Sequence, residues 1–443
     1  MESPILSYAD EVWRGSVRPE DVPYTELRRD GVQEITYGVG MWPACGNVYV
    51  IRGEDGLGLF DTGDMGDDGD VPRPYRVIRK WSAEPLKYAI FSHSRGDRLA
   101  GMEEFDAEPG PRPLVVAQEG LARRLAQQGR TAGYNALVDL REQGFPKLVW
   151  PPPQRLPDVT YRDRLSLSLG DVTFQLTHAR GDTDDATWAF LPERGVLLTG
   201  DLFAWTVPGA GDPQRTQRYP DDWAVALRAM AALDAGLLLP GRGLPIFGSA
   251  RVRRALTDTA DYLDSLVEQT LDLMNAGARL DEILHSVKPP PALAARPYLR
   301  ERHDEPEFIV RNIWRLHGGW HDGNPANLKP APDAVFARAV AELSAGAASV
   351  AGRAVAAAAD GDLRLACQLA ELAAQAEPED RRVHEIRALV YAMRVQQERG
   401  AIARGVYAWA AAESRSKTTG MDLLDVYHDV AEGRMWWLPS KAN

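Results

Sequence analysis

Histidine, aspartate and arginine side chains are concentrated in one short polar stretch, Ser92-His93-Ser94-Arg95-Gly96-Asp97-Arg98. An imidazole and a carboxylate this close together are groups that ligate metal ions or act as general acid and base. Guanidinium groups beside them bind anions or pair with carboxylates in a bidentate geometry. His93 and Asp97 are therefore candidate catalytic residues, and Arg95 and Arg98 are candidate substrate-binding residues.

Three later stretches carry the same types of side chain. The first, 177–187, contains His178 and Asp182, the second is Thr199-Gly200-Asp201, and the third, 237–243, contains Arg242. Each stretch lies at the end of a predicted β-strand. Because loops at one end of a sheet lie side by side, we expect these side chains to meet. Asp182 and Asp201 then join the candidate catalytic residues.

The elements that must position these side chains are mostly strands in the first half of the chain and helices in the second. Apolar or alternating runs predict strands at 46–53, 57–64, 88–91, 114–117, 165–169, 172–177, 188–191, 196–199 and 237–239. Helical spacing occurs at 73–81, 118–141 and 251–276, and Ala-rich helices cover 332–411. The predicted organisation is an N-terminal arm (1–30), an α/β domain (31–249), a helical domain (250–415) and a tail (416–443).

The composition is that of a soluble globular chain of 443 residues, which is long enough for two or three domains. A net charge of −12 argues against nucleic acid or an anionic membrane surface as the main partner. Two cysteines predict no disulfide framework. The sequence shows no signal peptide, and no apolar run approaches the roughly 18 residues of a membrane helix. We therefore expect a cytoplasmic protein.

The stretch 92–98 resembles the His-x-His-x-Asp-His signature of the metallo-β-lactamase superfamily, with His93 in the first His position and Asp97 in the Asp position. The later loops follow in the family's order. Trp320-His321-Asp322-Gly323-Asn324-Pro325 resembles a stretch of the alkyl-sulfatase dimerisation domain. The resemblance extends over roughly 40–415. It implies an αββα metallo-β-lactamase-like sandwich followed by an α-helical dimerisation domain, and a homodimer.

The sequence departs from this family at its metal ligands. The dizinc site of the family needs histidines at 93, 95, 98 and 242, and three of these positions hold arginine. Arginine has no lone pair to offer and stays protonated, so it cannot ligate a cation. In the resemblance Asp182 takes the place of a ligating glutamate and Asp201 that of a bridging carboxylate. His93, Asp182 and Asp201 remain as donors for a single ion.

Three functions are compatible with this exchange of imidazole for guanidinium. In the first, an Arg/Asp/His pocket without a cofactor performs acid/base chemistry on a small or medium anionic substrate bearing sulfate, phosphate or carboxylate. In the second, the Arg–Asp network is a structural plug in a non-catalytic homologue that binds a ligand or partner. In the third, one zinc or similar divalent ion makes a mono-metal hydrolase.

Further residues are assigned by their position. Arg215 and Arg218 follow the Asp201 strand, where related sulfatases place anion-binding side chains, and with His178 they complete the candidate substrate-binding set. Asp61 is interpreted as a turn-capping carboxylate beside the site. His303 belongs to no recognisable spacing pattern.

Overall fold

The computed structural model describes residues 3–44, 46–63, 73–144 and 155–434. The chain forms two compact units, one of residues 1–132 and 149–320 and the other of residues 133–148 and 321–443. This division differs from the predicted boundary at 250. The helix that follows that position, α9 (Ser249–Asn275), packs against α8 (Pro220–Ala231) and thereby belongs to the first unit.

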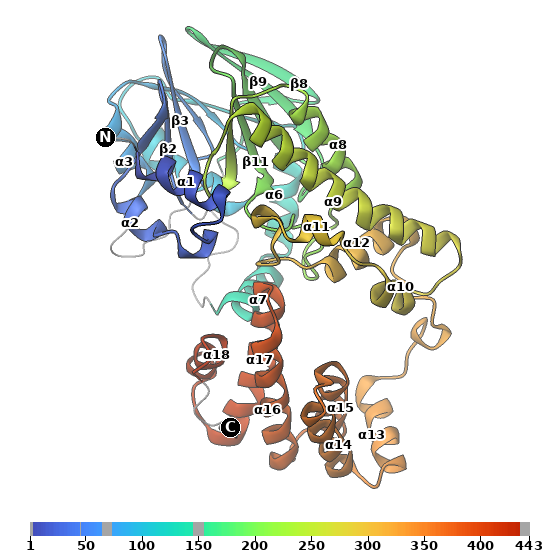
Figure 1. The fold of residues 1–443 in the computed structure, drawn as a ribbon. Helices are drawn as coiled ribbons and strands as arrows, with labels where there is room; N and C mark the ends of the chain where they lie inside the picture. Colours follow the sequence, from blue (N-terminus) through green and yellow to red (C-terminus); the bar gives the residue numbers. More distant parts are fainter. Residues whose placement is uncertain (1–2, 45, 64–72, 145–154, 435–443) are drawn as a thin grey trace. The chain divides into compact units, whose positions relative to one another are not determined.

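Two β-sheets form the centre of the first unit (Figure 1). One sheet has the order β1-β2-β3-β4-β5-β6-β7, antiparallel as far as β4 and parallel from β4 to β7. Its strands are β1 (Gln33–Thr36), β2 (Val39–Trp42), β3 (Val48–Gly53), β4 (Gly56–Phe60), β5 (Leu86–Ile90), β6 (Leu114–Gln118) and β7 (Val159–Tyr161).

The second sheet has the order β13-β12-β11-β10-β9-β8, and only its β11–β12 pair is parallel among the described strands. Its strands are β8 (Arg164–Leu169), β9 (Val172–Ala179), β10 (Ala186–Leu191), β11 (Val196–Ala204), β12 (Leu237–Arg242) and β13 (Ile246–Phe247). The apolar runs predicted as strands therefore lie in these two sheets.

Side-chain alternation along β3 shows how both faces of a sheet are covered. Val48 and Val50 contribute to a core shared with helices α3 (Pro74–Trp81), α5 (Met102–Asp106) and α6 (Leu121–Arg130). Tyr49 and Ile51 point the opposite way, into the core shared with the second sheet. Figure 1 shows α8 and α9 along the second sheet. The predicted αββα sandwich is thereby confirmed.

The single helix predicted over 118–141 is two helices. The break falls at Thr131, between α6 and α7 (Ala132–Gln143). Gly129 and Gly133 flank this break, and glycine is a poor helix former. The two helices also belong to different units, since α6 packs on the first sheet whereas α7 is part of the second unit.

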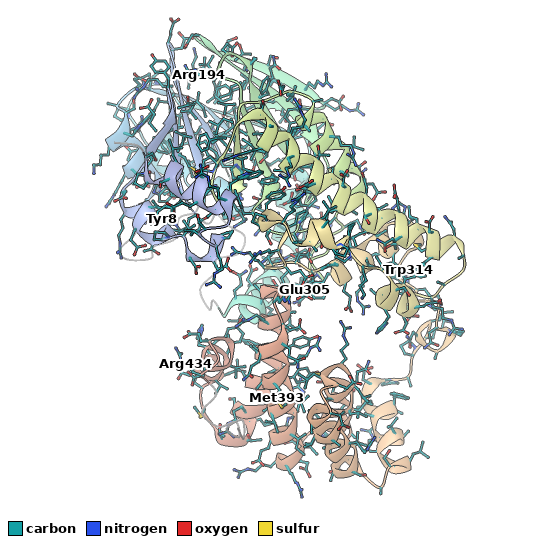
Figure 2. The ribbon with its side chains drawn as sticks, in the orientation of Figure 1. Tyr8, Arg194, Glu305, Trp314, Met393 and Arg434 are labelled. Carbon is teal, nitrogen blue, oxygen red and sulfur yellow. The ribbon has the colours of Figure 1, made fainter. Side chains whose placement is uncertain are left out.

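The second unit is helical. It contains α7, α13 (Asp333–Leu343), α14 (Ala347–Ala359), α15 (Leu363–Ala376), α16 (Arg381–Gln397), α17 (Ala401–Thr419) and α18 (Leu423–Ala431). Alanine is prominent on the buried faces of α14, α15 and α17, whereas Figure 2 shows a larger side chain, Met393, on α16. No single helix among the described residues is long and apolar enough to cross a membrane, although α13 and α14, bent by 86° at their junction, reach that length and composition together.

Candidate active site

The candidate side chains are carried by strand ends and by the loops that follow them. Asp61 follows β4, His93 follows β5 after two residues, and Asp182 follows β9. Asp201 lies within β11, and Arg242 is the last residue of β12. The two sheets thus bring together side chains that are far apart in sequence, as predicted from the strand ends.

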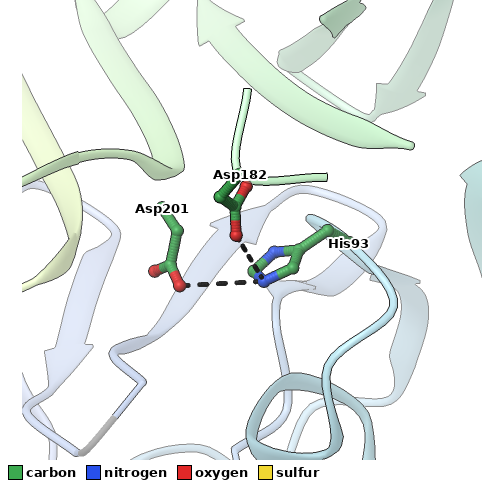
Figure 3. Close-up of side chains that lie close together, drawn as sticks. All are labelled: His93, Asp182 and Asp201. Atoms are coloured by element: carbon green, nitrogen blue, oxygen red, sulfur yellow. Dashed lines mark ion pairs between the residues drawn. The ribbon is translucent and has the colours of Figure 1, made fainter. Parts of the chain in front are cut away.

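His93, Asp182 and Asp201 form a buried cluster (Figure 3). The His93 Nε2 atom lies 3.5 Å from Asp182 Oδ2 and 3.7 Å from Asp201 Oδ2. The three side chains are 1%, 6% and 9% exposed. One imidazole nitrogen therefore faces two carboxylates in a place with little access to water.

Ser92 and Asp61 fix the orientation of the His93 ring. The Ser92 hydroxyl donates to Asp61 Oδ2 (2.7 Å) and is 2.9 Å from His93 Nδ1. Because the hydroxyl proton is committed to the carboxylate, Nδ1 carries a proton and donates to Ser92 Oγ. The other ring nitrogen, Nε2, is left to face the carboxylates.

Asp61 does more than cap a turn. Its φ of 61° lies in the left-handed region, which aspartate tolerates better than most residues. Its second carboxylate oxygen accepts from the Ser92 main-chain N–H (2.7 Å). Burial raises the pKa of Asp61 to about 6, although the Arg98 guanidinium acts in the opposite direction. Asp61 is thus the end of a hydrogen-bonded chain that holds His93 in place.

The cluster fits a single divalent cation. His93 Nε2 and both carboxylate oxygens of Asp182 are buried without a hydrogen-bond partner. Two ligand atoms that are each about 2.1 Å from a tetrahedral zinc ion are about 3.4 Å apart. The distances of 3.5 and 3.7 Å from Nε2 to the two carboxylates are close to that separation. A proton on Nε2 would reach one carboxylate at most, and at a length that is poor for a hydrogen bond.

Arg98 is the most deeply buried of the arginines. Its side chain is 0% exposed and forms an ion pair with Asp201 Oδ1. Its Nη1 donates to the Gly241 carbonyl (3.0 Å) and lies 3.9 Å from Asp61 Oδ2. Burial alone raises the pKa of Asp201, but the guanidiniums of Arg98 and Arg242 outweigh it and hold this pKa below its usual range. Arg98 is therefore enclosed by the protein and does not face solvent.

Arg95 and Arg242 keep part of their surface accessible, with exposed fractions of 41% and 29%. Both are held by Asp97, at 3.4 Å from Arg95 Nε and 2.6 Å from Arg242 Nη2. Burial raises the pKa of Asp97, but these two guanidiniums hold it well below its usual value. Arg242 Nε also lies 3.5 Å from Asp201 Oδ2. Asp97 thus positions two arginines that solutes can reach.

Arg218 and Arg215 approach the cluster from the other side. Arg218 Nη1 lies 3.7 Å from Asp182 Oδ2, and its Nη2 donates to Asp212 (3.2 Å). Arg215 Nε lies 3.8 Å from the same Asp212 oxygen. The structure thus places Arg218 next to Asp182 and Arg215 next to Asp212, and Arg218 is the more buried of the two arginines.

The structure does not bring His178 into this cluster. Its Nδ1 atom donates to the Ala186 carbonyl of the neighbouring strand (3.1 Å). Its main-chain N–H donates to Asp163 (2.9 Å). The described contacts of His178 are thus to backbone atoms of nearby strands and turns, and none of them reaches His93, Asp182 or Asp201.

His303 lies near the site although no sequence pattern singled it out. Burial lowers the pKa of His303 to about 4, and Asp212, Arg95 and Arg242 are the charged groups that act on it most. The adjacent residue, Asp304, anchors this segment because its carboxylate accepts from the main-chain N–H groups of Gly211 (2.6 Å) and Asp212 (3.0 Å). The run Arg302-His303-Asp304, directly before α12 (Pro306–Gly318), is the signal that could have found it.

Two family models match this chain. The model described as "Metallo-beta-lactamase superfamily" matches residues 43–242, and "Alkyl sulfatase dimerisation" matches residues 279–417. The chain therefore combines a metallo-β-lactamase domain with an alkyl sulfatase dimerisation domain. This pair of domains matches the alkyl sulfatase-like subgroup.

Curated relatives are similar to this chain over most of its length, and a solved structure shares its fold. A linear primary-alkylsulfatase of Pseudomonas sp. (strain ATCC 19151) is 28% identical over 76% of this chain and 68% of its own length. An (R)-specific secondary-alkylsulfatase of Pseudomonas sp. is 26% identical, over 85% of this chain and 60% of its own length. The structure of the stereoselective inverting sec-alkylsulfatase Pisa1 from Pseudomonas sp. has the same fold, with a TM-score of 0.78 and 23% identity over 88% of this chain and 66% of that one.

Proposed function

We propose that this protein is a sulfatase-like enzyme that acts on a small or medium anionic ester. The observation that carries the proposal is a buried cluster of donor atoms without hydrogen-bond partners, His93 Nε2 and the carboxylate of Asp182, in the same site as the accessible arginines. A purely structural site would satisfy these atoms within the protein. Alkylsulfatase relatives support a sulfate ester as the first substrate to test.

The accessible arginines are the groups that would bind the anionic end of the substrate. Arg95 and Arg242 present planar guanidiniums, which match the oxygens of sulfate, phosphate or carboxylate. Both are preoriented by Asp97, so that less conformational entropy is lost on binding. Burial, together with the charge of these arginines, lowers the pKa of His303 to about 4, so that it is neutral at pH 7 and can donate an N–H without adding charge.

The donor cluster is the reacting centre in this proposal. A divalent ion held by His93, Asp182 and Asp201 would supply Lewis-acid chemistry, polarising an ester oxygen or a water molecule. Ser92 and Asp61 keep the His93 ring in one tautomer, and Arg218 stabilises negative charge next to Asp182. The contacts favour a single ion over the metal-free acid/base version, because a proton on His93 Nε2 would reach one carboxylate at most, and at a length that is poor for a hydrogen bond.

The metal-free enzyme is the second candidate. The close contact between Ser92 and His93 favours it, since His93 with both nitrogens protonated would be an acid facing two carboxylates. In that version His93 gives its Nε2 proton to the leaving oxygen as the ester bond breaks, and a water molecule adds its hydroxyl group to the other fragment and returns its remaining proton to His93.

Sulfate release separates the candidates. The chelator-treated protein and the protein reloaded with zinc are each incubated with short- and medium-chain primary and secondary alkyl sulfates, and inorganic sulfate is measured. Release by the zinc-loaded form alone supports the single-ion enzyme, whereas equal release by both forms supports the acid/base version. Asp182→Asn is the inactive control in either case. Binding of the alkyl sulfates without any release would contradict both and leave the non-catalytic homologue.

We also propose that the chain forms a homodimer through its helical region, because the dimerisation model matches residues 279–417. Light scattering on the eluting protein measures the mass directly. A monomer at micromolar concentration would contradict this proposal.

A further inference from the structure

Arg98 contributes a permanent positive charge in the interior of the site. The side chain is 0% exposed, and a guanidinium group carries a fixed positive charge in proteins. It pairs with Asp201 Oδ1 and lies 3.9 Å from Asp61 Oδ2. The same group therefore compensates two buried carboxylates, which is what a bound cation does in a metal centre.

The surrounding backbone leaves room for this guanidinium. A Cβ atom at Gly46 would lie 2.6 Å from the guanidinium carbon of Arg98, so any larger residue there would displace the group. The Gly241 carbonyl accepts from Arg98 Nη1 (3.0 Å), and Asn47 holds that loop by donating its side-chain amide to the carbonyls of Pro240 (3.0 Å) and Gly243 (2.9 Å). The guanidinium thus occupies a site shaped to contain it.

The two oxygens of Asp201 face different cations. Oδ1 is committed to Arg98, whereas Oδ2 lies 3.7 Å from His93 Nε2, on the side of the donor cluster. A metal ion at the Arg98 side would need Oδ1 and the space of the guanidinium. Two unit positive charges about 4 Å apart repel by about 4 kcal/mol at an effective dielectric of 20, and a divalent ion doubles this repulsion, so the guanidinium disfavours a metal ion on its own side.

We propose that Arg98 is a built-in cation that takes the place of a second metal ion, so that each chain binds one divalent ion at His93, Asp182 and Asp201. This inference rests on the proposed function in placing an ion at that cluster. It does not depend on turnover, because the number of ions bound is measured without a substrate.

Ion counting tests the inference. The full-length protein is freed of metal with a chelator, titrated with zinc chloride and examined by native mass spectrometry. We expect one zinc per wild-type chain and none tightly held by Asp182→Asn. Arg98→His removes the fixed charge and supplies an imidazole next to Asp97 and Asp201, so that a second zinc is expected. Two zinc ions in the wild type, or none at saturating zinc, would overturn the inference.

Two further variants keep the test decisive if Arg98→His folds poorly. Arg98→Met removes the charge without adding a donor, and we expect it still to bind one zinc but at least tenfold more tightly. Arg253→His adds an imidazole on the exposed face of α9, where Arg253 pairs with Asp234, and we expect the wild-type count. A second zinc on Arg253→His would show that the gain is not specific to position 98. One zinc without sulfate release would contradict the proposed function and leave the Arg98 inference intact.

Discussion

Two buried arginines, Arg387 and Arg98, one in each compact unit, differ in how completely the charged groups around them are hydrogen-bonded. Arg387 on α16 donates to Glu371 (2.8 Å), to the Ala410 carbonyl (2.7 Å) and to the Ser414 hydroxyl (2.9 Å). Tyr391 donates to the same Glu371 oxygen (2.9 Å). No buried polar side-chain atom of these residues lacks a hydrogen-bond partner.

The Arg98 site is built differently. Arg98 itself is paired with Asp201, but Arg98 Nε, His93 Nε2 and both oxygens of Asp182 are buried without a hydrogen-bond partner. A buried polar atom without a partner costs about 1–3 kcal/mol, and a cation or ligand bound at the cluster would recover that cost. The network around Arg387 thus serves stability, whereas the network around Arg98 is arranged for an additional cation and a ligand.

The largest expected effect on the free energy of unfolding is at the network around Arg387. Arg387→Met leaves Glu371 without its cation, and we expect the free energy of unfolding to fall by about 2–3 kcal/mol. Added zinc should not change this loss. Denaturant unfolding with and without zinc measures it, and Arg382→Met, an exposed arginine on the same helix, is the matched control with a change below about 0.5 kcal/mol. If zinc restored the free energy of unfolding of Arg387→Met, the Arg387 network would also respond to a metal ion, and the two networks would not differ in function.

Neutralising one carboxylate in each network should change stability in opposite directions. Asp182→Asn replaces a buried charge that has no hydrogen bond, and we expect the ion-free protein to gain about 1 kcal/mol. Glu371→Gln weakens two existing hydrogen bonds and should lose about 1–2 kcal/mol. The two variants are compared by denaturant unfolding after chelator dialysis. A loss of stability in both would mean that Asp182 is structural.

The positions of the strand ends explain why much of the site could be predicted from the sequence. His93, Asp182 and Asp201 each lie in a polar loop or register shift at the end of an apolar run, and two facing sheets bring such ends together. Asp97 lies in the short helix that follows the loop of His93. The depth of a side chain could not be predicted in this way. Arg95 and Arg98 are three residues apart, yet one is 41% exposed and the other 0%, because Arg95 precedes the short helix that carries Arg98 inward.

Residues that reach the site from distant segments of the chain could not be predicted from the sequence either. His303 and Asp304 come from a segment after the sandwich, and they reach the site only because α9 folds back along the second sheet. The predicted boundary at 250 assigned this segment to the helical domain. The hydrogen bonds from the loop at 211–212 to Asp304 were therefore not predicted. His178 had a suitable type and position, but strand register fixes its ring against the Ala186 carbonyl.

The orientation of His93 provides a smaller test of the comparison. Ser92→Ala removes the acceptor for Nδ1 and should weaken zinc binding about tenfold, while unfolding becomes easier by about 1 kcal/mol. Zinc titration of the chelator-treated variant measures the first effect. Ser166→Ala, at an exposed position of β8, is the control and should match the wild type. If Ser92→Ala bound zinc as the wild type does, the Asp61–Ser92 chain would serve the fold and not the ion.

The smallest effect on stability is expected for the accessible arginines. Arg242→Gln removes a group that is 29% exposed and held by Asp97, so the free energy of unfolding should change by about 0.5 kcal/mol or less. Substrate binding should respond far more, with KM for an alkyl sulfate rising about tenfold, which corresponds to about 1.4 kcal/mol. Initial rates over a range of substrate concentration measure this change. A stability loss as large as that of Arg387→Met, with KM unchanged, would assign Arg242 to the structural class and leave Arg95 as the anion-binding candidate. A higher KM with little change in the free energy of unfolding would separate the two kinds of arginine by function. Arg98 would compensate buried carboxylates, and Arg242 would face the substrate.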